Sequence, residues 1–213
     1  LSLLSASDSG LRSDDAITAS TRVLNLRTTL SNDAVAGDSL SLYNNTTLLS
    51  RITLTSAQIA AGYADLTVSA NALVTGAYVN IIRAQITDRA GNEGAFYTLP
   101  DLTILGLPAA PTNLDLIADS DSASAGAPGS DSTGTNTDNI TRWNTNFVIS
   151  GSLAGNIVGI LVYDDSDRMT PLGQAEVNLD TLTWTFNYTG APYADGTRAF
   201  YARAIDMAGN RSD

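Results

Sequence analysis

The sequence contains no cysteine, no histidine and no lysine, and only two of its acidic residues, Glu93 and Glu176, are glutamate. Without cysteine the chain forms no disulfide, so its rigidity must come from its core or from bound ions. Without histidine it lacks the commonest general base and the commonest transition-metal ligand. Solvated helix faces usually carry Glu and Lys, so their scarcity argues against a helical protein. We therefore expect an all-β protein that is not an enzyme.

Other features are missing as well. No apolar run approaches the roughly 18 residues of a membrane span, so we expect no direct membrane insertion. The first ten residues lack a charged start and a long apolar stretch, so we expect no signal peptide and interpret the chain as an internal fragment. With 22 acidic and 11 basic residues the net charge is −11. A basic footprint is absent, which makes nucleic acid an improbable partner.

What the sequence does contain favours strands. Apolar residues make up 43% of the 213 residues, and Val, Ile, Leu and Thr dominate the runs, as is typical of strands. Aspartate stands mostly beside Gly, Ser and Asn, where its short side chain can hydrogen-bond the backbone of a turn. The length fits one large domain or two domains of about 100 residues.

Three motifs occur twice in the same order, which decides between these possibilities. They are LSLLSASDSG (1–10) with LDLIADSDS (114–122), SDDAIT (13–18) with TDNIT (137–141), and AQITDRAGN (84–92) with ARAIDMAGN (202–210). The offsets between the copies are 113, 123 and 118 residues, and the drift indicates an insertion at 122–134. The prolines of the segment 105–113 favour an extended linker. We predict one module over 1–108 and a second over 109–213.

Within each copy, short alternating runs are separated by turn signals, which predicts two tandem immunoglobulin-like β-sandwich modules joined end to end. Trp184 and Phe186 alternate with Thr183 and Thr185, so the aromatic pair should face the core. The segment 55–62 has capping-box spacing and predicts one helical turn. We expect strands near 1–5, 22–30, 39–43, 47–54, 64–69, 79–87 and 95–105, and then near 114–118, 146–150, 157–163, 172–177, 182–187 and 197–205.

The second copy has no counterpart of the last strand of the first copy, 95–105. A sandwich without its closing strand exposes a strand edge. We expect that edge to be frayed or paired with a neighbour.

The series SDSG, SDDAIT, GDSLSLY, ITLTSAQIAAGYADLTVS and AQITDRAGN resembles the tandem immunoglobulin-like repeats of giant bacterial surface adhesins of the biofilm-associated and RTX type. The resemblance covers nearly the whole chain. It implies seven-stranded sandwiches with calcium at or near the module joints, in a stalk that projects a terminal binding domain from the cell. One departure is LTILGLPAAP, in which Gly106 stands where the family commonly has an aspartate.

Two clusters of oxygen ligands in each module suit calcium, which binds six to eight oxygens. One cluster follows the opening strand and the other follows the sixth strand. The same residues are also ordinary turn formers that need no metal, so both interpretations remain open. The candidate ligands are Asp8, Asp14, Asp15, Asp88 and Asn92 in the first copy, and Asp119, Asp121, Asp138, Asp206 and Asn210 in the second; Asp131 lies nearby.

Successive strands of the predicted sandwich run alternately up and down, so the loops after the first and the sixth strand lie at opposite ends of a module. Asp8 and Asp88 should therefore not share an ion. Across the joint, Asp8 and Asp15 could face Asp206 and Asn210. We therefore expect a monomeric extender of a secreted bacterial surface adhesin, whose direct partners are neighbouring modules. Contact with a host or biofilm surface would be made by other domains. The alternative is a glycan- or surface-binding module, with Trp184, Tyr188, Tyr193 and the insertion as candidate contacts.

Overall fold

The computed structural model describes residues 1–121, 139–141, 143–165 and 167–213. The predicted all-β class is confirmed: the helices of the described residues are α1 (Ser56–Ala61) and one 3-10 turn, Ala70–Ala72. Neither is long and apolar enough to cross a membrane. The chain divides into two compact units. The first comprises Leu1–Leu107 with Met207–Asn210, and the second comprises Pro108–Asp206 with Arg211–Asp213.

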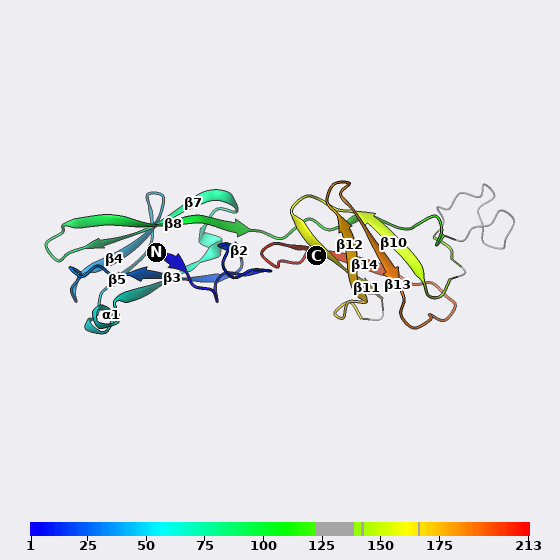
Figure 1. Ribbon diagram of the computed structural model, residues 1–213, viewed down its shortest axis with the longest axis horizontal. Coiled ribbons are helices and arrows are strands. Elements are labelled where there is room, and N and C mark those ends of the chain that lie inside the picture. Colours follow the sequence, from blue (N-terminus) through cyan, green and yellow to red (C-terminus); the bar gives the residue numbers. More distant parts are fainter. Residues whose placement is uncertain (122–138, 142, 166) are drawn as a thin grey trace. The chain divides into compact units, whose positions relative to one another are not determined.

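The first unit is a sandwich of two sheets with strand orders β1-β3-β6 and β2-β8-β7-β4-β5. Figure 1 shows β3 in one layer of this unit and β8 in the other. Every pairing is antiparallel except that of β2 with β8, which is parallel. The strands are β1 (Ser2–Leu3), β2 (Ile17–Ala19), β3 (Val23–Thr29), β4 (Ser39–Asn44), β5 (Thr47–Thr53), β6 (Tyr63–Ser69), β7 (Gly76–Thr87) and β8 (Glu93–Leu105).

Alternating side chains build the core of this unit. In β6 every second residue is buried, because successive side chains of a strand point to opposite faces of the sheet. Leu24 and Leu26 of β3 meet Leu102 and Ile104 of β8 in one cluster. The predicted capping box is also confirmed, since Thr55 and the helix residue Gln58 each bond the other's backbone N–H.

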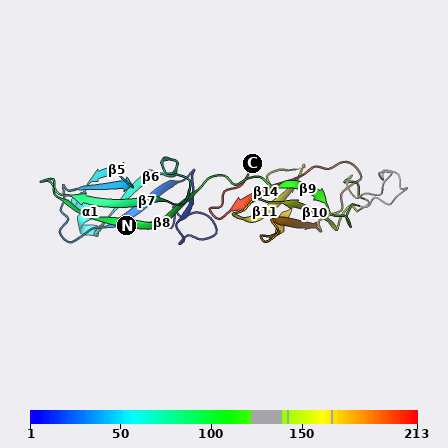
Figure 2. The same cartoon turned by 90° about the horizontal axis from the view of Figure 1, so that it is seen from above.

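The second unit has six strands in the order β14-β11-β12-β13-β10-β9. In the turned view of Figure 2, β9 lies beside β10 and β14 beside β11. β12 pairs with β11 through its first half and with β13 through its second half, so it links the two halves of the sheet. The strands are β9 (Thr112–Leu116), β10 (Phe147–Ser152), β11 (Ile157–Asp164), β12 (Gly173–Asn178), β13 (Thr183–Tyr188) and β14 (Phe200–Asp206).

The core of the second unit is more aromatic. Trp184 and Phe186 are buried and Thr183 and Thr185 are exposed, as the alternation predicts. The indole of Trp184 lies against Gly151, where a Cβ atom would stand only 2.7 Å from the ring. Glycine at this position therefore gives the indole its place in the core.

One edge of the second unit is largely open. β14 pairs with β11 along one side. On its other side, the described residues provide a bridge between Ile205 and Arg211 and a hydrogen bond from the Ser212 N–H to the Ala204 carbonyl. In the first unit, by contrast, β7 is paired along both sides, with β4 and with β8.

Because each unit has its own core, we predict that the two units unfold separately. Leu66→Ala in β6 should destabilise the first unit by about 2–5 kcal/mol, and Ile160→Ala in β11 should do the same to the second. Both side chains are almost fully buried. Differential scanning calorimetry of the whole chain should show each variant lowering a different transition. A single transition lowered equally by both variants would contradict this.

Candidate functional site

The loop between β1 and β2 carries the first unit's chain from one sheet to the other. It begins where the N–H of Leu4 donates to the carbonyl of Asn25 at 2.9 Å. The hydroxyl of Ser7 then accepts the N–H of Asn25 at 2.8 Å, and Oδ2 of Asp8 accepts the N–H of Ala16 at 3.0 Å. Ala16 has a φ of 55°, a left-handed conformation that costs a residue with a Cβ roughly 1–2 kcal/mol. The Asp8 carboxylate helps to hold this strained crossing in place.

Asp8 is the electrostatically unusual residue of the loop. Its side chain is buried, and its Oδ1 has no hydrogen-bond partner among the described residues. Burial raises the pKa of Asp8 above its ordinary value of 3.8; the Ala16 N–H lowers this pKa, and the nearby charge of Asp15 raises it further. A buried carboxylate with one unpaired oxygen and a like charge beside it is costly.

The second unit repeats this arrangement at the offsets of the sequence motifs. The N–H of Ile117, the counterpart of Leu4, donates to the carbonyl of Val148 at 3.1 Å. The hydroxyl of Ser120 accepts the Val148 N–H at 2.8 Å, and Oδ2 of Asp121 accepts the N–H of Asn139 at 3.2 Å. Asn139 also has a positive φ, 56°. Asp121 therefore corresponds to Asp8 in burial and in backbone partner.

The other predicted ligands of this cluster are placed differently. Asp15 stays beside Asp8 and accepts the N–H of Ile17 at 3.1 Å. Asp14 is exposed and forms an ion pair with Arg12 at 3.1 Å, which lowers the pKa of Asp14. Asp119 is exposed in the turn after β9. Asp131 and Asp138 lie outside the described residues.

The second predicted cluster is a self-contained turn in the first unit. Both oxygens of Asp88 accept hydrogen bonds, Oδ1 from the N–H groups of Ala90 and Asn92 and Oδ2 from the side-chain amide of Asn92. The Asn92 amide is the main reason that the pKa of Asp88 is lowered. Asp88 lies at the closed end of the β7–β8 hairpin, whereas the Asp8 loop lies beside the other end of β8. The two clusters are at opposite ends of the unit, as the count of alternating strands predicts.

The counterparts of this turn fall in different units. Asn210, grouped with the first unit, donates its side-chain amide to the carbonyls of Leu105 and Gly106 at 3.2 and 3.0 Å. Asp206 is buried at the end of β14 in the second unit. A calcium site shared by Asp8, Asp15, Asp206 and Asn210 stays a prediction.

The aromatic residues considered for glycan contact belong to the core. Trp184 and Tyr188 are buried, and Tyr193 stacks on Tyr188 with ring centroids 4.9 Å apart. The Tyr193 hydroxyl donates to Asp164 at 2.7 Å. These rings do not form an exposed stacking platform.

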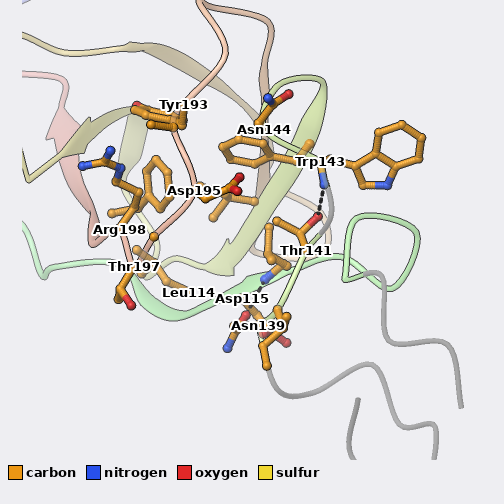
Figure 3. A pocket seen from close by; sticks show the side chains of 17 residues that line it. Leu114, Asp115, Asn139, Thr141, Trp143, Asn144, Tyr193, Asp195, Thr197 and Arg198 are labelled. Carbon is orange, nitrogen blue, oxygen red and sulfur yellow. Dashed lines mark hydrogen bonds between the residues drawn. The ribbon is translucent and has the colours of Figure 1, made fainter. Parts of the chain in front are cut away.

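Sequence reasoning missed a cavity of about 770 Å³ in the second unit. Figure 3 shows Thr197 and Arg198 on one side of it and Asn139 and Thr141 on the other. Its apolar lining includes Leu114, Phe147 and Phe200. Its walls come from segments far apart in the sequence, so no local pattern indicated it.

The structure allows the predicted calcium ligands of the first unit to be compared with what calcium requires. Asp8 and Asp15 carry carboxylate oxygens of the kind that calcium prefers as ligands. Oδ1 of Asp8 accepts no hydrogen bond from the described residues. Among the described residues, no group of three or more acidic side chains could hold a metal ion. An ion beside Asp8 and Asp15 would therefore need further oxygens from backbone carbonyls or water.

Comparisons with known proteins leave the family undefined. No family model matches the chain, and no curated protein matches it significantly. Solved structures that match across its length include the human OSCAR ligand-binding domain, with 13% identity, a TM-score of 0.34 and coverage of 93% of this chain and 89% of that one. A chain of a cytokine receptor complex has 10% identity, a TM-score of 0.30 and coverage of 92% and 96%.

A third match is a chain of the mouse coronavirus receptor-binding domain complexed with its murine receptor. It has 9% identity, a TM-score of 0.34 and coverage of 93% of this chain and 92% of that one. Likenesses at these values carry no argument about function.

Replacing the buried carboxylate tests its electrostatic cost. Because the pKa of Asp8 is raised in the folded state, its contribution to stability is fully present below about pH 3.8 and is lost as pH rises through the raised pKa. In chelator at pH 7, Asp8→Asn should therefore raise the melting temperature of the first unit, and the gain should vanish in acid. The measurement is thermal unfolding from pH 3 to 8.

Asp14→Asn is the matched control, because it removes the same charge from the same loop. The pKa of Asp14 is lowered by Arg12, so the stability from that pair is present above about pH 3.8 and lost as pH falls. This control should not be stabilised at pH 7. Equal stabilisation by both substitutions would mean that the lower net negative charge, and not the burial of Asp8, raises the melting temperature.

The positive φ of Ala16 gives a second prediction. Asparagine tolerates the left-handed conformation better than alanine, and Asn139 already occupies the counterpart position with a similar φ. Ala16→Asn should raise the free energy of unfolding of the first unit by up to about 1 kcal/mol. Urea denaturation measures this, with Ala64→Asn in the core of β6 as a destabilising contrast. A neutral or destabilising Ala16→Asn would show that the conformation carries no strain.

Proposed function

We propose that the chain is two tandem immunoglobulin-like modules joined end to end, and that they act as an extender in a large secreted bacterial surface adhesin. In this proposal calcium stiffens the extender, its direct partners are neighbouring modules of the same chain, and it has no catalytic role. The adhesin motifs of the sequence support this assignment.

The observation that carries the proposal is the doubled loop around a buried aspartate. Leu4, Ser7 and Asp8 make the same backbone contacts as Ile117, Ser120 and Asp121. Matching hydrogen bonds at the motif offsets support duplication of one module. A chain of repeated sandwiches with polar loops is suited to spanning distance.

Calcium fits the same loop. An ion at Asp8 and Asp15 would offset the repulsion and the burial that raise the pKa of Asp8. In the second module, Asp121 and Asp138 stand at the corresponding sequence positions. In each loop, calcium would supply the positive charge that offsets the repulsion between the carboxylates. We expect the weak affinity of extracellular modules, a Kd of about 10⁻⁴–10⁻³ M.

Calcium titration of variants tests this proposal. With a Kd of about 10⁻⁴ M, 10 mM calcium should stabilise the first unit by about 2.7 kcal/mol. Asp8→Asn and Asp15→Asn should each abolish most of this gain, and Asp14→Asn should keep it. Thermal unfolding in calcium, magnesium and chelator measures the shifts, and titration calorimetry measures binding. Wild type without a calcium response, or Asp14→Asn losing as much as Asp8→Asn, would refute the site.

A further inference from the structure

The larger sheet of the first unit carries two arginines on strands that have no acidic residue. These strands are β4, β5 and β7, in a chain with 22 acidic and 11 basic residues. Arg51 of β5 and Arg83 of β7 point away from the core, because their neighbours Ile52 and Ile82 pack in it. Among the described residues, neither guanidinium group forms an ion pair. Two cations without an acidic partner therefore share the outer face of this sheet.

Cross-strand pairing places these arginines beside aromatic rings. One row of directly opposite residues crosses the sheet from β5 to β8; it consists of Arg51, Ser41, Gln85 and Phe96. In the next row, Tyr43 of β4 is opposite Arg83. Neighbouring strands are about 4.8 Å apart, so the four strands form a strip roughly 14 Å wide at the backbone. Cationic and aromatic side chains lie together on this strip.

Both guanidinium groups are held in place by hydrogen bonds. Nη2 of Arg83 donates to the carbonyl of Asn45 at 2.5 Å, and Nε of Arg83 is buried. Nε of Arg51 donates to the hydroxyl of Ser41 at 2.8 Å. Nη1 of Arg83 and the two Nη atoms of Arg51 are the donors that remain for a ligand. Because the side chains are already positioned, binding costs less conformational entropy.

Phe96 adds an apolar surface beside the cations. Its side chain is 46% exposed, and the guanidinium carbon of Arg83 lies 4.7 Å from the centroid of its ring. Tyr43 meets this ring edge-on, with ring centroids 6.0 Å apart. Leu48, opposite Tyr43, continues the apolar surface. Such a surface can pack against the apolar face of a sugar ring, while a guanidinium group binds a carboxylate through charge-assisted hydrogen bonds.

The pairing of the strands limits how a partner can bind. Strands β4 and β7 are each paired along both sides, so a ligand cannot add a strand beside either of them and must lie across their side chains. One acidic residue, Glu93, borders the face; it is opposite Thr87, and its carboxylate accepts a hydrogen bond from Gln85 at 3.5 Å. The two arginines outnumber this carboxylate, so the face favours a ligand of negative charge.

We propose that the outer face of β5, β4, β7 and β8 binds an acidic polysaccharide, a chain of sugar rings that bear carboxylates. Arg51 and Arg83 pair with carboxylates of the polysaccharide, and Phe96 packs against one of its rings. The site lies on one sheet of one unit and requires no calcium. The inference therefore goes beyond the proposed extender function and does not depend on it.

A galacturonate oligosaccharide tests the proposal with the whole chain in chelator. Its methyl ester is the matched control, because it has the same rings without the charge. At physiological ionic strength, charges more than about 8 Å away are largely screened, so the acidity of the rest of the chain should not prevent binding. Titration calorimetry should show binding of the acid and binding of the ester that is at least about 10-fold weaker. No binding of the acid, or equal binding of the ester, would overturn the proposal.

A polyglutamate peptide of the same charge distinguishes a polysaccharide from an acidic protein. It has carboxylates but no sugar rings to pack against Phe96, so it should bind at least about 5-fold more weakly than the oligosaccharide. Equal or tighter binding of the peptide would overturn the proposal in favour of an acidic protein partner.

Chain variants locate the site. Arg51→Gln and Arg83→Gln should each weaken binding of the acid about 10-fold, and Phe96→Thr should weaken it about 5-fold. Arg22→Gln removes the same charge from an exposed residue between β2 and β3 and should bind like wild type. Arg51 is exposed, so Arg51→Gln should leave the fold intact by circular dichroism. Wild-type affinity in Arg51→Gln, or an equal loss in Arg22→Gln, would overturn the location.

Discussion

A buried carboxylate holds the point at which the chain crosses from one sheet of the first unit to the other. Asp8 accepts the N–H of Ala16, which has a positive φ and directly precedes β2, the strand that pairs with β8. The same bond joins Asp121 to Asn139 in the second unit. A neutral side chain could accept this hydrogen bond at lower electrostatic cost. Under the calcium proposal, a bound cation would offset this cost in both units.

Much of the fold could be predicted from the sequence because strand alternation is a local property. Trp184 and Phe186 face the core as the pattern indicates, and the Thr55 capping box forms as its spacing indicates. The short β2 was not predicted, because three residues cannot show a period and its partner, β8, lies more than 80 residues away in sequence. Parallel pairing of this kind depends on tertiary contacts.

The candidate site was predictable only as a cluster. In the stretch DSGLRSDD, each aspartate stands beside residues that are typical of turns. Nothing in the local sequence distinguishes a buried carboxylate from an exposed one. The structure separates Asp8, buried with an unpaired oxygen, from Asp14, exposed and paired with Arg12. The cavity beside β14 was not predicted either, because its walls come from segments more than 50 residues apart.

Small-angle X-ray scattering of the whole chain, in calcium and then in chelator, tests the extender account most directly. If calcium stiffens the connection between modules, chelation should shorten the maximum dimension or broaden its distribution while each sandwich stays folded by circular dichroism. A scattering profile that is the same in both conditions would contradict an ion-stiffened extender and would leave these aspartates as ordinary turn residues.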